Sequence, residues 1–319
     1  TPPSINVSEV LKNDRQLKSL IGLGYDEFQK LLNEFTSCLK EDHSKNRKGK
    51  LKKSRQRKIG GGRKSALGSP ENQLLFILFY LKTYPTYDVL AFTFNISRSC
   101  AFESVQRLLP ILKHTQKNLK VLPKRTTDDP QELLQIVESV DHILIDATER
   151  PIQRPQKPAR QKKHYSGKKG FHTVKNTTVS DTDKRILILG ATVPGSQHDY
   201  SLFKEEFDPK IDWFSSTNAS TDLGYQGIKT DYLSPENIHI PHKKPRKSKQ
   251  NPDPKLTRQQ KRENRQIGRV RVLVEHAIGG MKVFRVLTIR LRNHLKHLAD
   301  DFIFATAGLW NLKNSFAVQ

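Results

Sequence analysis

Apolar residues recur at helical spacing through the first 42 positions of the chain. They fall at intervals of three and four residues, and a second helix is expected to open at Tyr25, with acidic side chains in its first turn. Residues 43–68 break the pattern, since they contain little that is apolar, three successive glycines, and eleven lysines and arginines between His43 and Lys64. Such a segment buries too little apolar surface to fold alone. We therefore predict a small N-terminal helical segment (1–42) and a basic linker or arm (43–68).

Residues 69–125 return to helical periodicity and predict a helix-turn-helix domain. After a first, largely apolar helix, a short helix is expected over 87–94 and a longer one over 98–113. A short helix, a tight turn and a longer helix are typical of DNA-binding units in which the last helix enters the major groove. The polar face of that helix carries Arg98 and Arg107, which are able to read base edges. An ordinary three-helix bundle with a solvated polar face is the alternative.

Strand periodicity takes over between residues 141 and 245. Strands are expected over 143–145, 170–179 and 185–193, then a helix over 199–207, a strand that reaches residue 222, and a last strand over 238–240.

This order of elements is that of the ribonuclease-H-like fold, an α/β fold with a mixed five-stranded sheet and helices. The first and fourth strands of that fold are neighbours. Asp146 ends the first strand and Asp222 ends the fourth, so the two carboxylates are expected to converge. We assign residues 126–319 to this α/β domain, which follows the all-α helix-turn-helix domain.

A linker rich in Lys, Arg and Pro, over 243–256, leads into a long helix. Thr257 opens the Thr-x-x-Gln pattern of a capping box, so the helix is expected to run from there to about residue 281. Arg271, Glu275 and Lys282 share one stripe of this helix, separate from its apolar stripe. Glu275 alone would be read as a surface ion pair worth about 0–1 kcal/mol, and it gains weight only beside the two aspartates. A further stripe is basic and suits phosphates: Arg258, Lys261, Arg262, Arg265 and Arg269.

The charge of the chain is strongly one-sided. Fifty-six lysines and arginines against 32 acidic residues give a formal net charge of +24, a field that attracts phosphate backbones. Double-stranded DNA is therefore the expected partner. Cys38 and Cys100 are too few for a disulfide framework or a cysteine zinc site. No apolar run approaches the roughly 18 residues that span a bilayer, so no membrane partner is expected.

The single methionine of the chain is Met281. We therefore do not expect Thr1 to be a natural initiation site, and we infer no targeting signal from the first residues.

Three carboxylates on rigid elements suit phosphodiester chemistry. Cleavage and transesterification place extra negative charge on oxygen, and two Mg²⁺ ions about 3.5–4 Å apart activate the attacking oxygen and stabilise the leaving one. Mg²⁺ prefers hard oxygen ligands and binds few protein groups. Asp146, Asp222 and Glu275 meet that demand in a basic chain. DNA strand cleavage and joining is the leading hypothesis.

The order and spacing of several short segments resemble the DDE transposases of bacterial insertion sequences. The similarity is to insertion sequence family five and its eukaryotic PIF/Harbinger relatives, and it covers roughly residues 70–315. The segments that carry it are Ile145-Asp146-Ala147-Thr148-Glu149, Tyr165-Ser166-Gly167-Lys168-Lys169, His172-Thr173-Val174-Lys175, Gly195-Ser196-Gln197-His198-Asp199, Asp222-Leu223-Gly224-Tyr225 and residues 271–282.

This resemblance implies an enzyme in which residues 126–319 are the catalytic domain. Asp146, Asp222 and Glu275 would form its metal-binding triad, with two Mg²⁺ ions for which Mn²⁺ would substitute. The resemblance also implies a homodimer that assembles on terminal inverted repeats and acts on target DNA. Its place would be the bacterial cytoplasm, in association with the nucleoid.

The signature of the family on the last helix places Tyr, Arg, Glu and Lys with two, three and six residues between them. Arg271, Glu275 and Lys282 match it, and Gly268 stands at the tyrosine position. Arg271 and Lys282 are accordingly expected to hold DNA phosphates, whereas no stacking or phosphate role is expected at Gly268.

Two further segments have two interpretations each. Asp199 is either a fourth contributor to the metal site or the N-cap of the helix that follows it. Lys168 and Lys169 either grip DNA near the site or belong to a plain basic loop. Arg265 and Arg269, from the basic stripe of the last helix, are expected to contact the DNA backbone.

A transposase that cleaves and transfers DNA strands at terminal inverted repeats is the preferred function. The first alternative is a catalytically silent, transposase-derived DNA-binding protein, which the presence of all three acids argues against. The second is a DDE-type nuclease that does not transpose, which the reaction products would distinguish.

Overall fold

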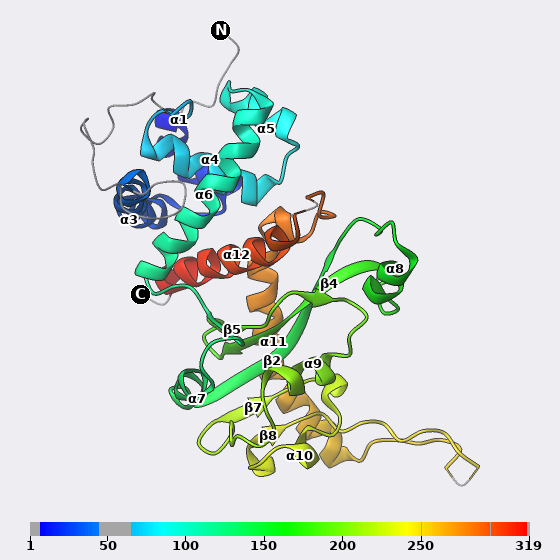
Figure 1. Cartoon of the computed structure of the whole chain (residues 1–319). Helices are drawn as coiled ribbons and strands as arrows, with labels where there is room; N and C mark the ends of the chain where they lie inside the picture. Colours follow the sequence, from blue (N-terminus) through cyan, green and yellow to red (C-terminus); the bar gives the residue numbers. More distant parts are fainter. Residues whose placement is uncertain (1–6, 45–64, 250, 294, 318–319) are drawn as a thin grey trace. The chain divides into compact units, whose positions relative to one another are not determined.

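The structure is a computed structural model that describes residues 7–44, 65–249, 251–293 and 295–317. Most of the expected basic arm over 43–68 therefore lies outside the described residues. The chain forms two compact units (Figure 1). The helical unit comprises the described residues up to Leu122, Met281–Ile289, and those from Asn293 onward, and the sheet unit comprises Pro123–Gly280 and Arg290–Arg292.

Helices build the helical unit. The expected helix start at Tyr25 is confirmed. Two helices precede it where the sequence predicted one, because Asn13 caps a new helix by accepting a hydrogen bond from the backbone N–H of Gln16 (3.0 Å). The elements are α1 (Val7–Lys12), α2 (Asp14–Ile21), α3 (Tyr25–Ser44), α4 (Pro70–Thr83), α5 (Tyr87–Phe94), α6 (Arg98–Asn118), the 3-10 helix η3 (Arg285–Leu287) and α12 (Lys296–Ala317).

The helix-turn-helix domain consists of α4, α5 and α6, as predicted. Ser69, Thr86 and Ser97 cap the three helices by accepting backbone hydrogen bonds. Asn95 ends α5 in the left-handed region, with φ 52°, and this turns the chain into α6 within a few residues. Every side chain of α4 from residue 73 to residue 81 is buried, so α4 forms the centre of the unit.

The last helix, α12, packs on α6 within the helical unit. Gln116 donates a hydrogen bond to the carbonyl of Ala305 (2.8 Å), and Asn311 donates one to the carbonyl of Val121 (2.9 Å). The segment assigned from sequence to the catalytic domain thus includes a helix that completes the helical core.

A mixed sheet and its helices build the sheet unit. The strands are β1 (Lys124–Arg125), β2 (His142–Pro151), β3 (Tyr165–Ser166), β4 (Phe171–Asp181), β5 (Ile186–Leu189), β6 (Val193–Pro194), β7 (Asn218–Ser220) and β8 (Ile238–His239). The helices are α7 (Pro130–Glu138), α8 (Pro158–His164), α9 (Asp199–Glu206), η1 (Leu223–Tyr225), α10 (Ile228–Asp231), η2 (Pro235–Asn237) and α11 (Arg258–Lys282), whose last two residues belong to the helical unit.

The strand order is β1-β5-β4-β2-β7-β8, and β3 and β6 pair with β4. β2 is antiparallel to β4 and parallel to β7, while β4 is antiparallel to β5 and β7 is parallel to β8. The five predicted strands are therefore present in the order of the ribonuclease-H-like fold. β1, β3 and β6 are two-residue additions that no periodicity signalled.

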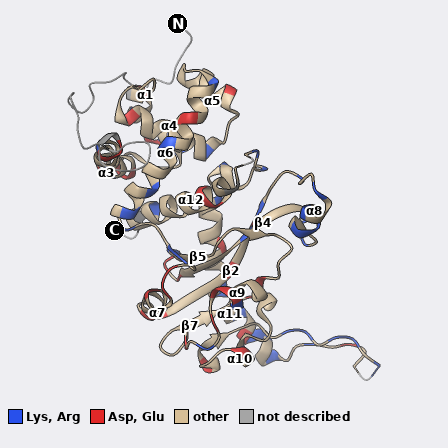
Figure 2. Cartoon of the chain, viewed as in Figure 1, with Lys and Arg blue, Asp and Glu red and all other residues tan. Residues whose placement is uncertain are grey.

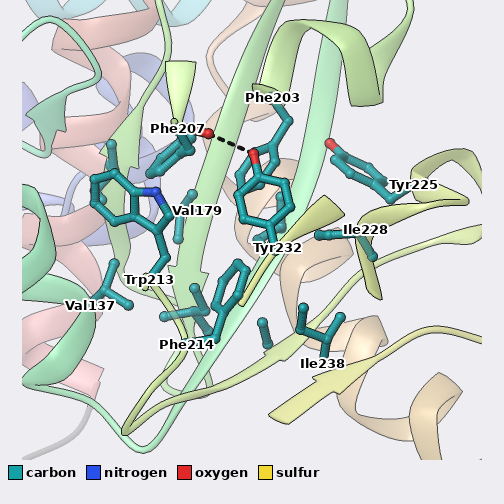
Figure 3. Close-up of a cluster of buried hydrophobic side chains, with 14 of the residues drawn as sticks. Val137, Val179, Phe203, Phe207, Trp213, Phe214, Tyr225, Ile228, Tyr232 and Ile238 are labelled. Carbon is teal, nitrogen blue, oxygen red and sulfur yellow. Dashed lines mark hydrogen bonds between the residues drawn. The ribbon is translucent and has the colours of Figure 1, made fainter. Parts of the chain in front are cut away.

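An aromatic cluster covers one face of this sheet (Figure 3). Ile145 and Val179, which face each other across β2 and β4, pack against Phe203 of α9 and against residues of α7 and α10. Tyr232 closes the cluster with a hydrogen bond from its hydroxyl to the carbonyl of Phe207 (2.6 Å). Because side chains alternate along a strand, residues next to Ile145 emerge on the opposite face.

The capping box that begins α11 is confirmed. The backbone N–H of Gln260 donates to the Thr257 hydroxyl (3.1 Å), and the backbone N–H of Thr257 donates to the Gln260 side chain (3.0 Å). These reciprocal bonds fix the start of the helix and hence which of its residues face the sheet.

Candidate active site

Asp146 lies within β2, which continues to Pro151 and does not end at Asp146 as expected, and Asp222 follows the end of the neighbouring parallel strand β7. β2 and β7 pair with Leu144 opposite Ser220, and each aspartate lies two residues beyond its member of that pair. Two steps along an extended chain return a side chain to the same face. Both carboxylates therefore emerge on the sheet face opposite Ile145, next to each other, as the sequence predicted.

Asp222 itself lies just past its strand. The fourth strand was expected to reach it, but β7 ends at Ser220, and Asp222 serves as the N-cap of η1. Its Oδ1 accepts a hydrogen bond from the backbone N–H of Gly224 (2.8 Å). This bond orients the Asp222 carboxylate through Oδ1. The other carboxylate oxygen, Oδ2, takes no part in the cap.

The acids around Asp146 change its protonation. Burial raises the pKa of Asp146 to about 6, and the charges of Asp222 and Asp199 add to the increase. A hydrogen bond from the backbone N–H of Ala147 (2.7 Å) and the charge of Arg271 act in the other direction. A buried carboxyl whose pKa is raised by burial and by neighbouring carboxylates is typical of a functional site.

Tyr225 brings a buried phenol to the same acids. Its side chain is fully buried, and in the part of the chain that the structure describes its hydroxyl has no hydrogen-bond partner. Burial raises the pKa of Tyr225, as do the charges of Asp146 and Asp199. The hydroxyl is therefore a protonated donor within electrostatic reach of the site. The sequence showed Tyr225 only as part of a family motif and gave it no role.

Asp199 is held by a buried lysine. It is the first residue of α9 rather than its N-cap, a position taken by His198 without a side-chain hydrogen bond. Its Oδ1 lies 2.6 Å from the Lys175 ammonium, whose side chain is only 6% exposed. Lys175 also donates to the carbonyl of Gln197 (2.7 Å) and lies 3.6 Å from Glu149. The cap interpretation of Asp199 is thus wrong.

The loop before Asp199 fits closely against β4. A Cβ on Gly195 would come within 1.8 Å of the Thr173 hydroxyl oxygen and 2.9 Å of the Thr173 carbonyl oxygen, so no larger residue is accommodated there. The Thr173 hydroxyl donates to Glu149 (2.8 Å). Gly195 therefore lets the loop approach the strand and places Asp199 beside Lys175.

The predicted third acid, Glu275, lies on α11. It is exposed, and Arg271 one turn earlier is half-buried. Residues four apart share a helix face, and the charge of Arg271 acts on Asp146. Glu275 therefore shares a face of α11 with Arg271, a residue whose charge reaches Asp146. Lys282 is half-buried and is the last residue of α11.

The chemistry of these side chains fits a divalent cation. Asp146 and Asp222 offer hard carboxylate oxygens, and the raised pKa of Asp146 shows that negative charge there is not fully balanced. Among the described residues, no three histidine, cysteine or acidic side chains already surround one metal position. The structure thus brings two of the three predicted ligands together and leaves Glu275 at the surface of α11.

The residues predicted to contact DNA lie in different settings (Figure 2). Lys168 and Lys169 are exposed in the turn between β3 and β4. In the helical unit, the Arg98 side chain is 70% exposed and lies 3.5 Å from Asp88, whereas Arg107 donates to Gln73 (2.7 Å). Of the predicted pair on α6, Arg98 is the more accessible. The basic stripe of α11 is exposed throughout: Arg258, Lys261, Arg262, Arg265 and Arg269.

The sequence did not predict α8. This short helix carries Arg160, Lys162 and Lys163 ahead of the basic turn over 167–170, and all three side chains are exposed. Figure 2 shows the resulting concentration of basic residues around α8. α8 has only 7 residues, about two turns, and this is too short for the helical spacing of apolar residues to be recognised in the sequence.

A ribonuclease-H-like sheet with an aspartate within β2 and another just after the neighbouring strand β7 defines an enzyme class that acts on nucleic-acid phosphodiesters. Comparison with known proteins agrees. The family model described as DDE superfamily endonuclease matches residues 145–311, and the helix-turn-helix of DDE superfamily endonuclease matches residues 65–117. The chain belongs to the DDE superfamily endonucleases, and the predicted relationship to transposases of insertion sequences is confirmed.

One relative is similar over most of both chains. It is a probable transposase for insertion sequence element IS702 from Microchaete diplosiphon, 31% identical over 243 residues, which cover 76% of this chain and 79% of the relative. No solved structure matches the chain significantly. None of the helices in the described ranges combines the length and hydropathy needed to cross a membrane.

Proposed function

We propose that this transposase binds the terminal inverted repeats of an insertion element and catalyses Mg²⁺-dependent cleavage and transfer of DNA strands. The observation that carries the proposal is the register of β2 and β7, which puts Asp146 and Asp222 next to each other on one face of the sheet. Family membership supplies the reaction class, and DDE superfamily endonucleases generally use divalent metal ions.

Asp146, Asp222 and Glu275 are the proposed metal ligands. A bound pair of divalent ions would activate the attacking oxygen and stabilise the leaving oxygen. The backbone N–H groups of Ala147 and Gly224 orient the two aspartates. Glu275 is proposed to join them from the exposed face of α11 when DNA and metal are bound. Asp199 stays outside the ligand set in this proposal, because Lys175 already holds its carboxylate.

The proposed DNA contacts divide by role. Lys168 and Lys169, with Arg265 and Arg269 of α11, neutralise backbone phosphates near the cleaved strand. Arg98, at the start of the last helix of the helix-turn-helix, reads base edges of the inverted repeat. Arg271 holds phosphates beside the acids, and Lys282 contacts DNA as the family resemblance implies. Arg107 contributes by positioning α6 through its bond to Gln73. Dimerisation on paired repeats remains a prediction from the family resemblance.

The test is a reaction of the purified chain with a DNA duplex that ends in the inverted repeat bracketing its gene, together with a supercoiled target plasmid. With Mg²⁺, we expect nicks at the repeat boundary and products joined to the plasmid. The Asp146→Asn variant should yield neither, while Glu236→Gln, an exposed acid outside the site, should react normally.

Two outcomes would contradict the proposal in different ways. Cleavage without joining, under conditions in which both ends are bound, indicates a nuclease that does not transpose. A specific footprint on the repeat with no cleavage in Mg²⁺ or Mn²⁺ indicates a catalytically silent DNA-binding protein.

A further inference from the structure

A cleft of about 630 Å³ opens in the sheet unit beside the paired aspartates. It lies among the ends of β2, β7 and β8 and the first half of α11. Ser220, two residues before Asp222, lines it, and so does Val270, the neighbour of Arg271. The volume falls within the roughly 300–1,000 Å³ that small-molecule sites occupy. The cleft is thus large enough for a ligand and adjoins the proposed active site.

Two imidazole rings form part of the cleft wall. The ring centroids of His142 and His239 are 5.8 Å apart, with an angle of 35° between the ring planes. His142 is hydrogen-bonded to the Ser220 hydroxyl (2.8 Å), and His239 to the side-chain oxygen of Asn218 (2.9 Å). These bonds hold both rings in fixed orientations at the edge of the sheet.

Burial lowers the pKa of His142, as does the charge of His239, and burial also lowers the pKa of His239. Both rings are therefore neutral at pH 7. Among the described residues, no three histidine, cysteine or acidic side chains form a metal-binding group. Both imidazole rings line the cleft. Histidine is one of the side chains on which proteins stack unpaired bases.

The remaining lining combines apolar surface with amide groups. Ile240, Pro241 and Ile267 supply the apolar surface, and Gln226 and Gln266 add side-chain amides that both donate and accept hydrogen bonds. This is the combination that a nucleobase requires, since its faces are apolar and its edges carry donors and acceptors.

The rim of the cleft is basic. Lys229 and Lys243 line it and are exposed, and so they are available to a phosphate. Glu263 is the acid of the lining, and its carboxylate is already engaged by His242 and by the amide of Gln259 (3.0 Å). An anionic ligand therefore meets two lysines and an acid that is paired.

We propose that this cleft binds one unpaired nucleotide of the DNA strand held at the paired aspartates, with the base between the imidazole rings and the α11 side chains and its phosphate at the lysines. The inference rests on the proposed function, because the adjoining acids determine which strand end reaches the cleft. A base drawn out of the duplex would fix the position of the neighbouring phosphodiester relative to Asp146 and Asp222.

The experiment combines abasic substitutions in the DNA with a variant that fills the cleft. Duplexes carrying the inverted repeat and its flank are made with a single abasic site at each position in turn, and binding and cleavage are measured for the full chain. If one base occupies the cleft, an abasic site at one position near the cleaved bond lowers affinity about 10-fold to 100-fold, the usual range for loss of one stacked base.

Ile267→Trp blocks the cleft, and Leu233→Trp is the matched control because Leu233 is exposed and outside the cleft. We expect Ile267→Trp to lower the affinity for the intact duplex by a similar factor. The abasic site should then cause no further loss of affinity in this variant, so that the two losses do not add. Leu233→Trp should keep the full sensitivity. Urea unfolding of each variant checks that Ile267→Trp retains its fold; if it does not, Gln266→Ala replaces it in the same comparison.

The possible failures are distinguishable. If the wild type cleaves the repeat but no abasic position alters its affinity, or if Ile267→Trp keeps the sensitivity of the wild type, the cleft does not hold a base and the proposed function stands. If a free deoxynucleotide binds the wild type and not Ile267→Trp, while no abasic position changes the affinity for the duplex, the ligand of the cleft is a nucleotide from solution. That result overturns the inference. If the wild type neither binds nor cleaves the repeat, the proposed function fails and the inference fails with it.

Discussion

Removing the charge of Asp146 should stabilise the protein when no metal is present. Folding raises the pKa of this carboxyl from 3.8 to about 6, mainly through burial. Each pKa unit corresponds to about 1.36 kcal/mol, so the ionised carboxylate costs the native state about 3 kcal/mol. A raised pKa in an acid means that the folded protein binds the proton more tightly. The cost is therefore absent below pH 3.8, grows between pH 3.8 and 6, and is complete above that range.

Asp146→Asn keeps an oxygen for the hydrogen bond from Ala147 and removes the charge. With EDTA present at pH 7.5, we expect the free energy of unfolding of this variant to exceed that of the wild type by up to about 3 kcal/mol. The difference should disappear as the pH falls towards 4. Urea unfolding followed by fluorescence measures it in a Trp310→Phe background, because Trp213 is then the remaining tryptophan and is buried in the sheet unit.

Asp253→Asn is the control, since Asp253 is exposed and its substitution should change stability by less than about 0.5 kcal/mol. The reasoning is refuted if Asp146→Asn destabilises the metal-free protein at pH 7.5, or if its effect does not depend on pH. Either result would mean that the carboxylate at Asp146 is already balanced by its surroundings and has no need of a cation.

Two further predictions concern the groups behind the site. Lys175→Met leaves Glu149 and Asp199 without their buried cation and should cost about 3–5 kcal/mol; Lys204→Met breaks an exposed pair with Asp231 and should cost less than about 1 kcal/mol. Equal losses in urea unfolding would contradict this account of Lys175. Gly195→Ala forces a Cβ against Thr173 and should lower the free energy of unfolding by about 1–3 kcal/mol. Gly167→Ala is the control and should be nearly neutral, because nothing lies within 4 Å of a Cβ there. A neutral Gly195→Ala would show that the loop does not depend on this close approach.

The sequence predicted the sheet because its strongest signals were local. Ile143-Leu144-Ile145 is an apolar run that ends in Asp146, and the order of strands and helices left few topologies to consider. The capping box at Thr257 likewise placed α11 correctly. These features depend on neighbouring residues or on element order, both of which a single sequence contains.

The features that the sequence did not predict depend on contacts between distant segments. Lys175 stands between Val174 and Asn176 in a strand of mostly polar residues, where a solvent-facing lysine would be expected, yet both faces of β4 are buried from Thr173 onward. Its partner Asp199 lies 24 residues later, and no local pattern links the two. The same holds for the cleft. Its histidines and its α11 side chains are far apart in the sequence, and only the folded sheet unit brings them to one cleft. Short elements such as α8 and β6 contain too few residues for a period to be visible.

The central claim is that Glu275 completes a metal site with Asp146 and Asp222, and a change of metal preference tests it most directly. A thiolate binds Mg²⁺ poorly and softer ions better. The account predicts that Glu275→Cys does not cleave inverted-repeat DNA with Mg²⁺ and recovers cleavage with Mn²⁺, while the exposed Glu236→Cys is active with both. Wild-type activity of Glu275→Cys in Mg²⁺ would contradict it, because Glu275 would then have no part in binding the metal.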